Sequence, residues 1–178
     1  KRDAPGGHWN DAYPFVRLHQ PASTYGVASQ TLGNGHIDQS GTNRGFYELS
    51  SRVEITNYYH SLMRDVFLAS GRVKYYPMSE YIGCGEFVSL LSGQKRHVTI
   101  KSKLVDATLL TTSVPATHTR KFEVAANVKC IPPNELPRTA AGHRKFMVIG
   151  AGKTAMDSLN WLLESGAPAE SISWVKPR

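Results

Sequence analysis

The chain has 178 residues, a formal net charge of +7 and a hydrophobic share of 40%. These values are typical of a globular protein of one or two domains, and they argue against intrinsic disorder. No apolar run approaches the roughly 20 residues that a membrane-spanning helix requires, so no membrane segment is expected. The two cysteines, Cys84 and Cys130, lack C-x-x-C spacing, and no two histidines are four positions apart. We therefore expect no metal site and a reducing, cytoplasmic setting.

The positive charge is spread along the chain. Lys and Arg occur at most in pairs, such as Lys95-Arg96 and Arg120-Lys121. Nucleic-acid-binding proteins usually gather basic residues on one face with interleaved aromatic residues. A nucleic-acid partner is therefore not expected, whereas a net positive charge suits the attraction of small polyanions such as nucleotides.

Residues 1–50 are rich in glycine, proline, histidine and aromatic residues and show no sustained period, which predicts extended loops around one short element. A helix is predicted next, between Ser51 and Gly71. Ser51 and Glu54 have the spacing of a capping box, and Gly71 is placed to end the helix. The apolar residues that follow at helical spacing are Ile55, Tyr59, Leu62, Met63 and Val66.

Beyond the helix, the hydrophobic period shifts to two. This pattern predicts an antiparallel meander of three strands over residues 73–75, 86–91 and 98–104, with glycine turns at 83–85 and 92–94. Residues 111–144 contain several prolines and few periodic signals, so they are interpreted as a connection between domains.

Residues 145–178 predict a strand at 146–149, a glycine turn, a helix at 154–165 and a second strand at 171–175. The turn carries the dinucleotide fingerprint in its variant with a final alanine. Its first glycine permits a tight turn, its second lets a pyrophosphate approach the backbone, and the small final residue lets the helix pack on the strand. The helix N-terminus supplies positive potential. The expected nucleotide-binding residues are Gly150, Ala151, Gly152, Lys153, Thr154 and Ala155; the alternative is a turn that merely connects strand and helix.

The end of the second strand indicates which nucleotide binds. An acidic residue about 20 positions after the glycines would bind the ribose 2′-hydroxyl of NAD. This chain has Lys176-Pro177-Arg178 at that place. Arg178 can pair with the 2′-phosphate of NADP through its forked guanidinium, and Lys176 adds a point charge, so NADP is favoured. The alternative is two solvated charges.

A second constellation lies near the N-terminus, where Gly6-Gly7-x-Trp9 precedes Tyr13-Pro14 and Arg17-Leu18. Taken alone, these residues could form a glycine turn that leads into an aromatic cluster. Together with the meander, Asp106-Ala107-Thr108 and the downstream fingerprint, their order resembles the flavin-dependent monooxygenase superfamily, which includes the flavin-containing monooxygenases. The Baeyer-Villiger fingerprint and the cysteine pair of disulfide reductases are missing.

The resemblance implies an α/β flavoprotein with two Rossmann-like dinucleotide-binding domains, one for FAD and one for NADP, and an antiparallel β-meander. Residues 1–110 would be a partial FAD-binding domain without its first phosphate loop, 111–144 the interdomain connection, and 145–178 the start of the NADP-binding domain. The implied FAD contacts are Gly6, Gly7, Trp9, Arg17 and Thr108, with His19 and Gln20 near the isoalloxazine ring.

The expected activity is that of an FAD-dependent, NADPH-using oxidoreductase, a monooxygenase that activates O2 and acts on an unidentified small molecule. No residue is assigned a catalytic role. The alternative is a non-catalytic nucleotide-binding or sensor module. Because the chain begins at Lys1, after the expected position of the first phosphate loop, we expect it to be an internal fragment that is inactive alone and binds FAD poorly.

Overall fold

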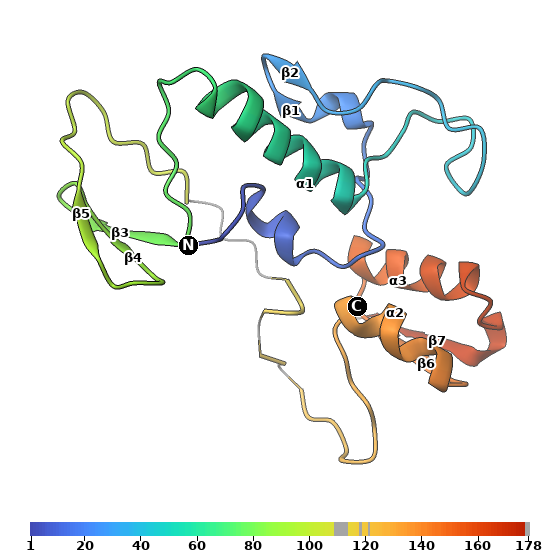
Figure 1. Ribbon diagram of the computed structural model, residues 1–178. Helices are drawn as coiled ribbons and strands as arrows, with labels where there is room; N and C mark the ends of the chain where they lie inside the picture. Colours follow the sequence, from blue (N-terminus) through green and yellow to red (C-terminus); the bar gives the residue numbers. More distant parts are fainter. Residues whose placement is uncertain (109–113, 118, 121, 177–178) are drawn as a thin grey trace. The chain divides into compact units, whose positions relative to one another are not determined.

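The computed structural model describes residues 1–108, 114–117, 119–120 and 122–176 (Figure 1). The chain divides into two compact units. Unit 1 comprises residues 1–10 and 55–112, and unit 2 comprises residues 11–54 and 113–178. Each unit therefore combines two stretches that are distant in sequence, and each is described by itself. The domain ranges that the resemblance implies stay a prediction.

A three-stranded antiparallel sheet forms in unit 1 from β3 (Ser79–Gly83), β4 (Glu86–Ser89) and β5 (Lys95–His97), in that order. The predicted meander is confirmed, and its middle strand lies where the sequence pattern placed it. The outer strands do not: neither 73–75 nor 98–104 belongs to this sheet.

The two turns explain the position of the outer strands. Gly83 pairs with Glu86, and both Cys84 and Gly85 between them have positive φ, as a two-residue hairpin turn requires. At the other end, the N–H of Ser89 donates to the carbonyl of Gln94 at 3.0 Å. A tight turn makes the residues directly after it the partner strand. The alternation of apolar and polar residues does not by itself determine which residues pair.

The predicted helix forms as α1 (Arg52–Ser61) and continues as a π-helix over Leu62–Leu68. Its capping box is confirmed. The backbone N–H and hydroxyl of Ser51 both donate to Glu54 Oε2, at 2.6 and 2.7 Å. At the far end, Gly71 has a φ of +66° and donates its N–H to the carbonyl of Leu68.

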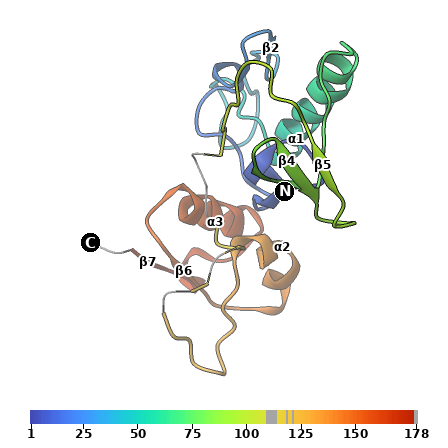
Figure 2. The same ribbon diagram turned by 90° about the vertical axis from the view of Figure 1, so that its left-hand side faces the viewer.

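Unit 2 contains β6 (Phe146–Ile149), α3 (Lys153–Glu164) and β7 (Ile172–Val175). The two strands pair in parallel from Phe146↔Ile172 to Ile149↔Val175, and α3 lies against the pair (Figure 2). The predicted strand, turn, helix and strand are confirmed, with the helix starting one residue earlier than expected. A helix that joins two parallel strands is a βαβ unit. The buried residues of α3 recur three and four positions apart: Ala155, Ser158 and Leu162.

The segment 11–18 also belongs to unit 2 and contributes to its core. Its buried residues are Ala12, Tyr13, Val16 and Leu18. The ring of Phe15 stacks on Trp161 of α3, with ring centres 5.4 Å apart. The N–H of Leu18 donates to the carbonyl of Ser50 at 2.9 Å. The core around α3 therefore includes residues from near the N-terminus.

The remaining elements are short. They are β1 (Gly26–Val27) and β2 (Gln30–Thr31), which pair antiparallel, α2 (Leu136–Thr139), and the 3-10 helices Gly7–Asp11, Ala22–Thr24, Pro133–Glu135, Ala140–Gly142 and Ala169–Ser171. Near α2, the Asn134 side chain donates to the carbonyl of Asp11 at 2.9 Å. In the part of the chain that the structure describes, no helix combines the length and apolar character needed to cross a membrane.

Candidate nucleotide-binding site

The turn between β6 and α3 begins at Gly150, whose φ of +132° is a conformation that other residues rarely adopt. Its N–H donates to the carbonyl of Val175 at 2.9 Å, which continues the strand pairing into the turn. A Cβ at this glycine would stand 3.6 Å from the Cβ of Ala155, which is buried. The space at Gly150 would admit a methyl group, so the positive φ is what favours glycine there.

Gly152 is the N-cap of α3 and has an extended backbone, with φ of −86° and ψ of 178°. A Cβ built on it meets no atom of the described residues within 4 Å. Having no side chain, it cannot cap the helix, and the first N–H groups of a helix have no acceptor within the helix itself. The backbone at Gly152 is therefore open to an approaching anion.

A polar cluster is centred on Asp157, one turn into α3. Its Oδ2 forms an ion pair with the ammonium of Lys153 and accepts a hydrogen bond from the hydroxyl of Tyr13 at 2.7 Å. Burial, together with the negative charge of Asp157, raises the pKa of Tyr13 well above its usual value. Tyr13 therefore remains a protonated donor at neutral pH.

Asp157 was not among the predicted site residues, and Tyr13 was noted only within the family motif. The spacing of Lys153 and Asp157, four positions apart on a helix, is a signal from which their ion pair could have been predicted. No local signal indicates the Tyr13 contact, because 144 positions separate it from Asp157.

The end of β7 is attached to the same turn through Trp174. Its Nε1 donates to the carbonyl of Gly150 at 2.6 Å. The ammonium of Lys176 lies 5.7 Å from the centre of the Trp174 ring, a cation–π geometry. The second predicted cation at this place, Arg178, lies outside the described residues.

Two of the residues implied as FAD contacts form a sharp turn in unit 1. Gly6 and Gly7 have φ of +110° and +55°, which explains why glycine occupies both positions. The backbone N–H of Trp9 donates to the carbonyl of Gly6 at 3.1 Å, and the Trp9 side chain is half-buried. A Cβ on Gly7 meets no described atom within 4 Å, so its backbone is open.

Thr108, also in unit 1, is exposed. Its N–H and hydroxyl donate to Asp106 Oδ1 at 2.8 and 2.6 Å. The hydroxyl bond, followed by the backbone bond, lowers the pKa of Asp106 below its usual range. Asp106 therefore bonds locally to the residue two positions further on, as aspartate side chains in loops commonly do.

The other implied FAD contacts, Arg17, His19 and Gln20, are exposed residues of unit 2. Arg17 is anchored by a hydrogen bond of 3.1 Å from its Nη1 to the carbonyl of Leu49. Neither unit by itself brings together all seven residues that the resemblance assigns to FAD. The FAD site thus stays a prediction.

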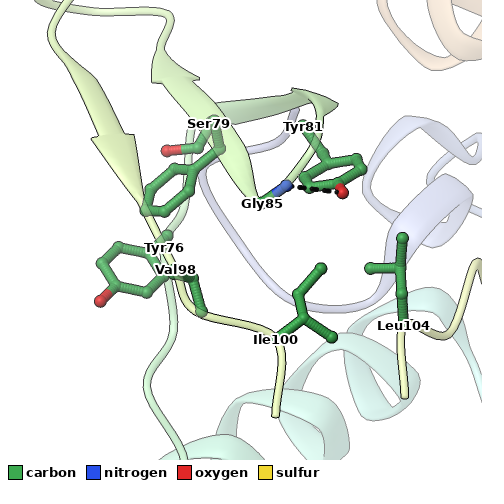
Figure 3. Close-up of a pocket in the computed structure, with 8 residues that line it drawn as sticks. Tyr76, Ser79, Tyr81, Gly85, Val98, Ile100 and Leu104 are labelled. Atoms are coloured by element: carbon green, nitrogen blue, oxygen red, sulfur yellow. Dashed lines mark hydrogen bonds between the residues drawn. The ribbon is translucent and has the colours of Figure 1, made fainter. Parts of the chain in front are cut away.

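An apolar hollow on the meander was not predicted from the sequence (Figure 3). It has a volume of about 380 Å³ and is lined by Tyr76, Ser79, Tyr81, Gly85, Phe87, Val98, Ile100 and Leu104. The Tyr81 hydroxyl accepts a hydrogen bond from the N–H of Gly85 at 3.0 Å. The alternation of Val98 and Ile100, interpreted as a strand, in fact places their apolar side chains at this hollow. Within the described ranges, no group of three or more His, Cys, Asp or Glu side chains is placed to hold a metal ion.

Comparison with known proteins found relatives in mycobacteria. Curated proteins of Mycobacterium tuberculosis and Mycobacterium bovis, each named only as uncharacterized, are 46% identical to this chain over 174 residues. The match covers 98% of this chain and 32% of each relative, so the chain spans about a third of the length of the curated relatives it matches. No family model matches the chain. No solved structure matches it either.

Proposed function

We propose that the full-length gene product is an FAD-dependent, NADPH-using oxidoreductase, a monooxygenase of the flavin-dependent superfamily with two Rossmann-like nucleotide-binding domains. In this chain, the turn from Gly150 to Ala155 would bind NADP. The observation that carries the proposal is the open backbone of Gly152 at the start of α3, between two parallel strands.

The residues of the turn fit the diphosphate of a dinucleotide. The positive φ of Gly150 turns the chain sharply from β6 into α3, and the small Ala155 permits close packing at the turn. A pyrophosphate that approaches Gly152 would accept hydrogen bonds from the first N–H groups of α3 and would lie at the positive end of the helix dipole. The structural alternative, a turn that only connects two elements, predicts that Gly152→Ala leaves NADPH affinity unchanged.

The choice of NADP over NAD is supported by Lys176. Its position over the indole of Trp174, which is bonded to the carbonyl of Gly150, orders a positive charge at the end of β7. The ribose of a dinucleotide lies at the end of the second strand in this type of fold. An ammonium there favours a 2′-phosphate and offers no acceptor for a 2′-hydroxyl.

The assignment of FAD is supported by the order of motifs and by the turn at Gly6 and Gly7, whose backbone permits close approach of a ligand. When bound, NADPH supplies hydride and FAD supplies the oxygen chemistry. The residues of this chain would bind and orient the two cofactors.

The test uses the full-length gene product. We expect purified protein to carry a yellow flavin and to consume NADPH in the presence of O2, with NADPH preferred over NADH. A colourless protein that neither binds nor consumes NADPH would contradict the proposal. Binding of NADPH without its consumption would favour a non-catalytic module. Release of one hydrogen peroxide for each NADPH consumed, whichever substrate is added, would favour a simple NADPH oxidase.

A further inference from the structure

We propose that Asp157 and Tyr13 are positioning residues for Lys153, and that together they hold the Lys153 ammonium at the first turn of α3, where it binds the phosphates of the dinucleotide. This inference rests on the proposed function of the turn. It adds two residues that the fingerprint does not contain and assigns a role to each.

The position of Lys153 follows from the helix. It is the first residue of α3, directly after Gly152, and Asp157 lies four positions further on. Residues with this spacing lie on the same face of a helix, and their ion pair is present in the structure. The pair keeps a long, flexible side chain at the N-terminal turn, so less rotamer freedom remains to be lost when a phosphate binds.

The ammonium can serve both partners. A lysine ammonium has three N–H donors and no acceptor, and the ion pair with Asp157 engages one of them. The two other donors of the ammonium would bind a phosphate oxygen that approaches the start of α3. Asp157 therefore orients Lys153 and does not prevent it from binding an anion.

Tyr13 holds the carboxylate in turn. Its hydroxyl donates to the same Oδ2 that pairs with Lys153, and the residue is 7% exposed. Tyr13 packs against Phe15, with ring centres 4.8 Å apart, and Phe15 stacks on Trp161. The buried Tyr13 thus holds the carboxylate of Asp157 in place, and the carboxylate in turn holds the ammonium of Lys153.

The experiment is a double-mutant cycle on NADPH affinity in the full-length gene product. We expect Lys153→Ala to weaken NADPH binding about tenfold, as the loss of one charge-assisted hydrogen bond does. Asp157→Asn should weaken it about threefold, and Tyr13→Phe about twofold, because both act only through the orientation of Lys153. In the Lys153→Ala background, neither substitution should have a further effect on affinity.

Each control makes a chemically similar substitution at an exposed residue away from the candidate site. The substitutions Lys129→Ala, Glu164→Gln and Tyr47→Phe should leave NADPH affinity unchanged. The salt dependence of binding should fall in Lys153→Ala and not in Tyr13→Phe, a difference that a general loss of structure would not produce. If Asp157→Asn does not fold, Tyr13→Phe with and without Lys153→Ala completes the same cycle.

The outcomes separate the two proposals. A wild-type protein that does not bind NADPH overturns the proposed function and this inference with it. A wild-type protein that binds NADPH while Lys153→Ala binds equally well overturns the inference alone. The inference is also overturned if Asp157→Asn tightens NADPH binding, which would mean that Asp157 masks the ammonium. It is overturned as well if Asp157→Asn weakens NADPH binding equally in the wild-type and Lys153→Ala proteins.

Discussion

The hydroxyl of Tyr13 donates to Oδ2 of Asp157 at 2.7 Å, although 144 positions separate the two residues. This bond attaches the segment 11–18 to α3, and the stack of Phe15 on Trp161 lies beside it. The segment that follows the N-terminal glycine turn is therefore part of the packing around the candidate nucleotide-binding helix.

The first prediction concerns the stability of this attachment. Tyr13→Phe removes a hydrogen bond to a charged acceptor and should lower the free energy of unfolding by about 1–3 kcal/mol at neutral pH. Because burial raises the pKa of Tyr13 above its ordinary value of 10.0, this contribution is fully present below that pH and is lost as pH rises through the elevated pKa. Urea unfolding at pH 7 and above pH 10 measures both effects; an equal loss in Tyr47→Phe would contradict the interpretation.

The second prediction compares two neighbouring leucines of α3. Leu162 is 1% exposed, whereas Leu163 is 48% exposed. Leu162→Ala should lower the free energy of unfolding by about 2–5 kcal/mol because it leaves a cavity, and Leu163→Ala should change it by less than about 1 kcal/mol. Both substitutions have the same helix propensity change, so the difference between their thermal unfolding midpoints reports burial. Similar midpoints would show that the helix face has been assigned wrongly.

The third prediction concerns the capping box at the start of α1. Partial burial by itself would raise the pKa of Glu54, but the two hydrogen bonds from Ser51 outweigh it. The charges of Arg17 and His36 add to this, and the net effect lowers the pKa of Glu54 below 4.5. Glu54 therefore contributes stability that is present above its unfolded-state pKa and is lost as pH falls through the lower folded-state pKa.

Glu54→Gln should accordingly flatten the loss of stability between about pH 5 and pH 3, because the titrating group is removed. Ser51→Ala should cost about 1 kcal/mol at pH 7 through loss of the cap. Helix content and unfolding midpoints measured across this range provide the test. If the stability of Glu54→Gln falls with decreasing pH as steeply as that of the wild type, other carboxylates cause the loss of stability in acid.

The fourth prediction separates the two glycines of the fingerprint. Gly150→Ala forces a side chain into a φ of +132° and should destabilise the fold by about 1–3 kcal/mol. Gly152→Ala places a methyl group in open space on a backbone that any residue can adopt, so it should cost no more than about 1 kcal/mol, through the poorer N-cap. That methyl group would obstruct a pyrophosphate, and NADPH affinity should fall at least tenfold, on the order of a lost phosphate contact. Unchanged affinity in a folded Gly152→Ala protein would contradict nucleotide binding at this turn.

The fifth prediction concerns nucleotide preference. Lys176→Ala should weaken NADPH binding about fivefold while leaving NADH binding nearly unchanged, because only NADPH carries the 2′-phosphate. Lys129→Ala, which removes the same charge from an exposed loop position, serves as the control. Equal losses for both nucleotides in Lys176→Ala would indicate a contribution to general charge attraction instead.

Local patterns were sufficient wherever the determining residues are neighbours in sequence. Ser51 and Glu54 are three positions apart, and their capping box forms as predicted. The turn at Gly150 and the helix that follows it also depend on adjacent residues. The outer strands of the meander were predicted at the wrong positions because their place depends on the hairpin turns, whose geometry overrides the alternation of side chains.

By itself, the sequence determined the presence of α1 and its cap, the middle strand of the meander, and the glycine turn with the helix that follows it, because each depends on short-range backbone chemistry. Only the tertiary structure decided that Tyr13 binds Asp157, that Trp174 bonds to the Gly150 carbonyl, and that Val98 and Ile100 line an apolar hollow. These contacts join residues far apart in the chain or beyond a turn. Their formation is governed by packing and by the pairing of buried polar groups, which no local pattern encodes.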